Sequence, residues 1–116
     1  MPERALARID LGAVERNCAL LASRLTNGAR LCAVVKADGY GHGADACAEA
    51  ALRGGAGWLA VATAREAEQI GRRLHHIRLL TMGALTASEV DTCSAQILSS
   101  VAITSSGTPA GTKMPK

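Results

Sequence analysis

The sequence predicts an α/β fold in which short parallel strands alternate with helices. Short apolar runs recur along the chain, and each is followed by a helical pattern that begins at a capping residue. This order is that of a parallel sheet with right-handed crossovers. Periodicity alone leaves two architectures open, a section of a barrel and a doubly wound sheet. A complete eight-unit barrel takes about 250 residues, so the 116 residues of this chain exclude one.

The first predicted element is an amphipathic helix that begins after Asp10. The Asp10 carboxylate is expected to accept the unpaired amides of the first turn. Asn27 and Gly28, which tolerate a left-handed conformation, are expected to stop the helix, and residues 4–9 to form a short extended arm. The apolar positions of the helix lie three or four residues apart, at Leu11, Val14, Cys18, Leu21 and Leu25.

Three apolar runs are predicted strands. Residues 31–35 are apolar on both faces, so we expect this strand to be covered on both sides. Residues 58–62 and 77–82 repeat the pattern. Residues 97–103 could form a fourth strand, which Ser99 and Ser100 weaken.

Helices are predicted between and after these strands. The first covers residues 44–53 and stops at Gly54 and Gly55. The second covers residues 63–74, and the third begins at Thr86. Both of these later helices open with a capping box, Thr63 with Glu66 and Thr86 with Glu89, in which hydroxyl and carboxylate satisfy each other's helix-start amides.

The chain divides into a folded part and a tail. Residues 1–104 are assigned to one domain, and residues 105–116 are predicted to be disordered. Ser, Thr, Gly and Pro dominate the tail, where Pro109 and Pro115 break any regular element.

Composition excludes several classes of function. The net charge of +3 comes from scattered Lys and Arg, so we expect no nucleic-acid partner. No apolar run approaches a membrane span, and the N-terminus lacks the core of a signal peptide, so we expect no membrane partner and a cytoplasmic protein. The four cysteines form no CxxC pair, and the adjacent His75 and His76 are poor partners for one metal, so we expect no metal site and free thiols.

Lys36 is the candidate nucleophile. It ends the first predicted strand, and active sites of such folds lie at the carboxyl ends of parallel strands. Partial withdrawal from water favours the neutral amine, which can attack a carbonyl and form a Schiff base. Gly39, Gly41 and Gly43 are expected to let the backbone approach a ligand, and Tyr40 to offer a hydroxyl. The helix that follows is expected to present free amides to an anion such as phosphate.

The string from Val34 to Gly43, Val-Val-Lys-Ala-Asp-Gly-Tyr-Gly-His-Gly, resembles the pyridoxal-phosphate attachment signature of the alanine racemases. An Ile-Asp-Leu segment at residues 9–11, a Leu-Ala-Val-Ala strand at 59–62 and a similar helix start at 63–67 agree with it. The resemblance covers about residues 5–91. It implies a partial TIM-like (β/α) barrel, the first three to four β/α units of that family's N-terminal domain.

The resemblance also implies chemistry. Lys36 matches the lysine that binds pyridoxal 5'-phosphate and serves as one of two bases at the substrate α-carbon, and Tyr40 matches the tyrosine whose hydroxyl contacts the cofactor phosphate. The family's enzymes are isomerases that interconvert L- and D-alanine, in bacteria for cell-wall synthesis. They work as homodimers in which the partner subunit supplies the opposite base, a tyrosine.

This chain has no second tyrosine and none of the later barrel strands. It is therefore expected to be truncated and inactive alone. Two alternatives to an alanine racemase stay open, namely a non-catalytic fragment or pyridoxal-phosphate-binding module, and another amino-acid racemase with the same signature.

Overall fold

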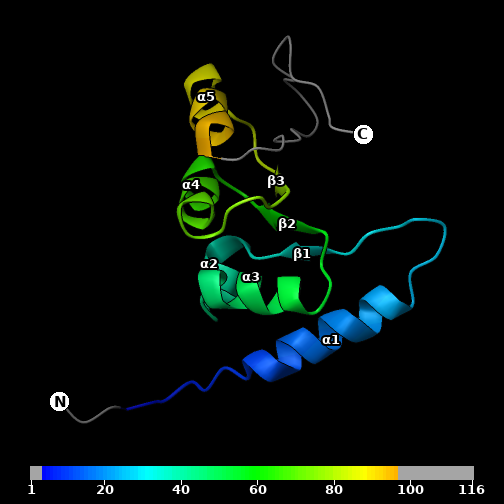
Figure 1. Cartoon of the computed structure of the whole chain (residues 1–116). Helices are drawn as coiled ribbons and strands as arrows, with labels where there is room; N and C mark the ends of the chain where they lie inside the picture. Colours follow the sequence, from blue (N-terminus) through cyan, green and yellow to red (C-terminus); the bar gives the residue numbers. More distant parts are fainter. Residues whose placement is uncertain (1–3, 97–116) are drawn as a thin grey trace.

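The computed structural model describes residues 4–96 of the chain, with side chains to residue 91. The predicted fourth strand at 97–103 and the predicted tail at 105–116 lie outside the described residues. Helices and strands alternate through the described part (Figure 1). In chain order they are α1 (Leu11–Ser23), β1 (Cys32–Val34), α2 (Lys36–Tyr40), α3 (Ala44–Arg53), β2 (Trp58–Val61), α4 (Ala64–Arg73), β3 (Leu79–Thr81) and α5 (Ala87–Gln96).

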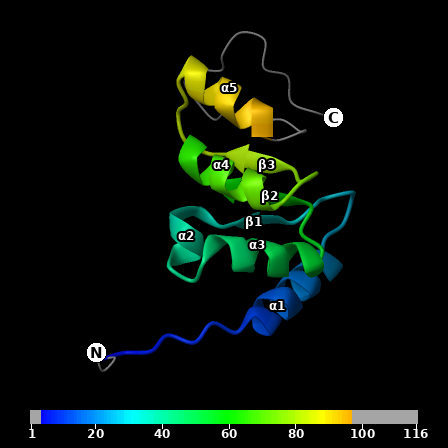
Figure 2. The same ribbon diagram turned by 60° about the vertical axis from the view of Figure 1, so that its left-hand side comes forward.

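The described strands form a three-stranded parallel sheet in the order β1-β2-β3, which confirms the predicted parallel α/β arrangement. Val34 pairs with Ala60 across β1 and β2, and Val61 pairs with Thr81 across β2 and β3. Figure 2 shows the strands side by side in chain order, with α3 beside β1 and α4 beside β2. All three strands therefore end at the same edge of the sheet.

The core lies on the helix side of this sheet. Leu59, Val61 and Leu79 are fully buried there, together with Ala67 and Ile70 of α4. The core contains no aromatic ring, so it is filled by aliphatic side chains in close contact with small helix residues.

The expectation that the first strand is covered on both sides is wrong. Cys32 is exposed and Val34 is 38% exposed, whereas Val35 is only 4% exposed. Alternate residues of a strand point to opposite faces, and the described helices pack on one face only. The apolar run therefore fits a strand whose second face is open in the described part of the chain.

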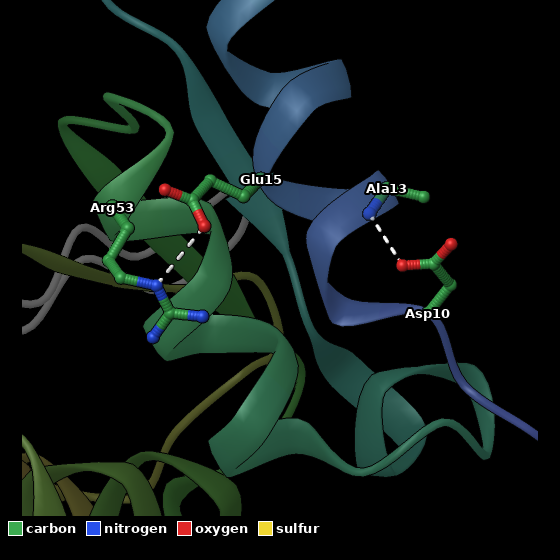
Figure 3. A network of polar contacts seen from close by, with 4 residues as sticks. All are labelled: Asp10, Ala13, Glu15 and Arg53. Atoms are coloured by element: carbon green, nitrogen blue, oxygen red, sulfur yellow. Dashed lines mark hydrogen bonds and ion pairs between the residues drawn. The ribbon is translucent and has the colours of Figure 1, made fainter.

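Helix α1 begins where the sequence predicts. Asp10 Oδ1 accepts a hydrogen bond from Ala13 N at 3.0 Å (Figure 3). The helix ends at Ser23, before the predicted Leu25, because the chain tightens there: Leu25 N donates to Ala22 O, three residues back. The left-handed residues Asn27 and Gly28 follow this end and shape the turn toward β1 instead of stopping the helix.

Only part of the predicted apolar face of α1 meets the core. Leu11 and Cys18 pack against it, whereas Leu21 is 55% exposed. Contact with α3 depends on Gly54, where an added Cβ would lie 2.5 Å from Glu15 O. An ion pair between Arg53 Nε and Glu15 Oε2, 3.3 Å apart, joins the same two helices (Figure 3).

Within the described residues no helix is both long and apolar enough to cross a membrane.

Candidate functional site at the carboxyl edge of the sheet

The carboxyl edge of the sheet brings together the segments that follow the three strands. Lys36 comes two residues after β1, Thr63 two residues after β2 and Gly83 two residues after β3. Val35 still belongs to the ladder, since its N–H donates to Ala60 O at 2.8 Å. The edge therefore carries the only lysine among residues 4–96, and the start of α4 lies beside it.

The backbone after Lys36 forms a left-handed turn. Ala37, Asp38, Gly39 and Tyr40 all have positive φ, of 51°, 54°, 63° and 58°. A left-handed conformation costs a non-glycine residue about 1–2 kcal/mol, because Cβ crowds the backbone. Successive residues in this conformation persist only where surrounding contacts enforce them, and such strain is concentrated at functional sites.

Hydrogen bonds within the segment hold this turn. Gly39 N donates to Val35 O at 2.9 Å, and Gly43 N donates to Asp38 O at 2.8 Å. Asp38 contributes its side chain as well, since Oδ1 accepts from Ala44 N at 2.9 Å and so caps the first turn of α3. The turn is thus joined at one end to β1 and at the other to α3.

One glycine of the segment has a structural role that differs from the expected ligand contact. Gly39 is buried, and a Cβ added there would lie 3.3 Å from Ala44 N. With its φ of +63°, this position favours glycine for packing against α3. Gly41 and Gly43 fit the expectation better, since an added Cβ at either would have no neighbour within 4 Å.

The two predicted site residues are the first and last residues of α2. Lys36 is half-buried, and no ion pair or hydrogen bond of its side chain is present within the described residues. Tyr40 is 59% exposed. The structure thus brings both into a single turn, with the amine partly withdrawn from water and the phenol open to it.

One of the amides that the sequence predicts to be free for an anion is already bonded at the start of α3. The amide of Ala44 is already bonded to the Asp38 carboxylate. At this amide a negative charge of the protein itself takes the place that a phosphate oxygen would take.

Sequence reasoning missed one residue of the site, Glu66. Its Oε2 accepts a hydrogen bond from Ala37 N at 2.9 Å, across 29 positions of sequence. The sequence assigned Glu66 to the capping box of α4 alone, and its Oε1 does accept from the Thr63 hydroxyl at 3.0 Å. The capping pattern is the sequence signal that could have identified Glu66, because a capping box directly after β2 places its carboxylate at the carboxyl edge of the sheet.

The cysteines of the described region are poor competitors for the role of nucleophile. Burial raises the pKa of the Cys47 thiol, and the nearby Asp38 charge raises that pKa further. Desolvation by nearby protein atoms also raises the pKa of Cys18 and of Cys32, although Cys32 as a residue is exposed. A raised pKa lowers the thiolate fraction, and the thiolate is the reactive form.

The remaining surface and the metal-binding side chains add no second site to the described residues. A depression of about 420 Å³ lies over α4, lined by Arg65, Glu68, Gln69 and Arg72. Among residues 4–91 no three side chains of His, Cys, Asp or Glu are grouped as a metal site would require.

Comparison with known proteins places this architecture in a family. A family model described as "Alanine racemase, N-terminal domain" matches residues 9–106. A protein of Thermobifida fusca named alanine racemase is 56% identical over 70 residues, which are 60% of this chain and 18% of the relative. One of Prochlorococcus marinus with the same name is 41% identical over 92 residues, 78% of this chain and 24% of the relative.

Solved structures agree. The crystal structure of alanine racemase from E. faecalis superposes with a TM-score of 0.74 at 33% identity, over 82% of this chain and 25% of that one. Alanine racemase from Streptomyces coelicolor gives a TM-score of 0.61 at 39% identity, over 72% of this chain and 24% of that one. The chain therefore spans no more than a quarter of the length of these relatives.

Proposed function

The chain belongs to the family of alanine racemase N-terminal domains, and on that premise we propose that it supplies the cofactor-binding lysine of a pyridoxal-phosphate-dependent alanine racemase. In this proposal Lys36 binds the cofactor and Tyr40 contacts its phosphate. The described strands are then the first units of a TIM-like barrel, in a cytoplasmic enzyme that makes D-alanine for the cell wall.

The observation that carries the proposal is the place of Lys36. The only lysine among residues 4–96 follows the first parallel strand at the carboxyl edge, half-buried and without a carboxylate partner in the described region. A neutral primary amine is the form that reacts with an aldehyde carbonyl.

The residues present fit pyridoxal phosphate at its point of attachment. Lys36 offers the amine, the exposed Tyr40 offers a hydroxyl donor, and the space beside Gly41 and Gly43 is open. At the start of α3 the amide of Ala44 does not serve the phosphate, because it is already bonded to Asp38. We infer that most of the phosphate-binding groups lie outside residues 4–96.

When bound, the cofactor supplies an electron sink that stabilises negative charge at the substrate α-carbon. The part that this chain performs is acid–base chemistry at one atom. Lys36 Nζ accepts the α-proton on one face of the substrate and can return it, while the left-handed turn fixes the backbone from which the side chain extends. Racemisation also needs a base on the opposite face, which we propose comes from a partner subunit of a homodimer.

A second candidate function is cofactor binding without racemisation. It is favoured by the coverage of the relatives, of which this chain spans 18% in one case and 24% in another. In that case Lys36 and Tyr40 bind pyridoxal phosphate, but the second base is missing and the α-proton is not replaced on the other face.

Covalent labelling tests the proposal. The chain is incubated with pyridoxal phosphate and reduced with borohydride, and the labelled peptides are identified by mass spectrometry. Lys113 and Lys116 are the other lysines of the sequence and serve as internal references. We expect Lys36 to be labelled about tenfold more than either, which corresponds to roughly 1.4 kcal/mol of preference. Lys36→Ala is expected to lose this label.

Equal labelling of all three lysines would overturn the proposal.

Incubation of the loaded chain with L-alanine separates the two candidate functions, racemisation and cofactor binding without racemisation. We expect no D-alanine from the 116-residue chain alone, and its formation would show that the chain supplies both bases.

A further inference from the structure

We propose that Glu66 is a positioning residue for Lys36. Its carboxylate joins two segments that meet at the carboxyl edge of the sheet, the start of α4 and the turn after β1. Oε2 accepts from Ala37 N at 2.9 Å, and Oε1 accepts from the Thr63 hydroxyl at 3.0 Å. Ala37 is the residue directly after Lys36, so this contact fixes the peptide group that carries the lysine.

The contact falls at the first left-handed residue of the turn. Ala37 has a φ of 51°, and its carbonyl oxygen accepts from Gly41 N at 3.0 Å. Its N–H takes no part in that bond and donates to Glu66, so without Glu66 it would depend on water. A conformation that alanine disfavours is therefore held at this point by a side chain from a different helix.

Glu66 is itself held in place. Its backbone N–H donates to Thr63 Oγ1 at 3.1 Å, and the side chain is half-buried. Ala64 and Ala67, its neighbours in α4, are buried in the core. The carboxylate is thus presented from a helix that is fixed to the sheet, as a rigid positioning group requires.

The role is indirect. Glu66 and Lys36 form no ion pair in the structure, so Glu66 acts through the Ala37 amide and not through the amine. The meaning of this placement rests on the proposed function, because only a reacting Lys36 needs its backbone fixed. The hydrogen bond itself can be tested without the cofactor.

The test compares Glu66→Ala with two matched variants. Glu66→Gln keeps an oxygen for Ala37 N and an amide for Thr63 Oγ1. Glu89→Ala removes the equivalent carboxylate of α5, whose Oε2 accepts from Thr86 N and not from another segment. Two readouts are measured on the whole chain, the labelling of Lys36 relative to Lys113, and the exchange rate of the Ala37 amide by NMR.

We expect Glu66→Ala to lower the labelling ratio and to raise the Ala37 exchange rate, each by about fivefold to tenfold, the factor for the loss of one typical hydrogen bond. Glu66→Gln should stay within about twofold of wild type, and Glu89→Ala should change neither readout. Glu66→Asp, one methylene shorter, replaces Glu66→Ala if that variant does not fold.

The same effect from Glu66→Ala and Glu89→Ala in both readouts would overturn the inference, because both would then act only through helix stability. If wild type shows no preferential labelling of Lys36, the proposed function fails. The exchange rate of the Ala37 amide then tests the role of Glu66 by itself. Faster exchange only in Glu66→Ala then supports the contact, and unchanged exchange overturns it.

Discussion

Helices α4 and α5 begin with the same sequence pattern, a threonine followed three residues later by a glutamate, but the two glutamates bond differently. At α5 the two residues form a reciprocal capping box. Glu89 Oε2 accepts from Thr86 N at 2.6 Å, and Thr86 Oγ1 accepts from Glu89 N at 3.3 Å. At α4 the threonine bond is kept, but the second carboxylate oxygen of Glu66 bonds to Ala37 in the turn after β1.

The difference lies in what surrounds each start. Helix α4 connects β2 to β3 in the chain, and its first turn contacts the turn after β1 through Glu66. Helix α5 follows the last described strand. A capping residue can thus serve its own helix or a neighbouring segment, and which one it serves depends on the groups within reach of its carboxylate.

The largest expected effect concerns the residue after each glutamate. Ala67 is fully buried, whereas the equivalent Val90 of α5 is half-buried. Ala67→Asp should lower the free energy of unfolding by about 3 kcal/mol or more, because an unpaired carboxylate is buried. Val90→Asp should cost about 1 kcal/mol. Urea denaturation followed by circular dichroism measures both, and equal losses would mean that α4 is no better anchored than α5.

Loss of a threonine hydroxyl should change stability in opposite directions at two positions. Thr63→Val should lower the free energy of unfolding by about 1 kcal/mol, because the N-cap bond is lost. Thr81 is fully buried, and its hydroxyl has no partner in the described structure. Thr81→Val should raise that free energy by about 1 kcal/mol, because an unsatisfied polar group is removed. A loss of stability in Thr81→Val would show that its hydroxyl is bonded in solution.

The smallest expected effect is the pH dependence of the stability that the reciprocal capping box at α5 contributes. The backbone N–H of Thr86, and next its side chain, lower the pKa of Glu89 below the ordinary value of 4.5. The folded state then binds fewer protons than the unfolded state in this range, so the stabilisation is present above pH 4.5 and is lost as the pH falls through the folded pKa. Melting temperatures measured down this range should fall less steeply in Glu89→Gln than in wild type. Parallel curves would contradict the lowered pKa.

Much of the local structure could be predicted from the sequence. Asp10, Thr63 and Thr86 cap the helices that they were expected to cap, because such bonds join residues only three positions apart. The position of Lys36 at the carboxyl end of the first strand was also predictable from local sequence. The apolar run and the residues that break it are adjacent in the chain.

The features that could not be predicted depend on contact between distant segments. The left-handed turn begins at Ala37, a residue whose own preference opposes it, and the bonds to Glu66 and Ala44 help to hold it. The open face of β1 at Val34 was not foreseen either, because an apolar residue has the same pattern whether or not a second layer covers it.

The sequence by itself determined the order of strands and helices, the helix starts and the position of Lys36 after the first strand. Each of these is set by hydrogen bonds and apolar spacing within a few residues. Only the tertiary structure decided which partner Glu66 takes and which face of the sheet is buried. Both outcomes depend on contacts between segments that are distant in sequence, such as the 29 positions between Ala37 and Glu66, and local preferences do not reach that far.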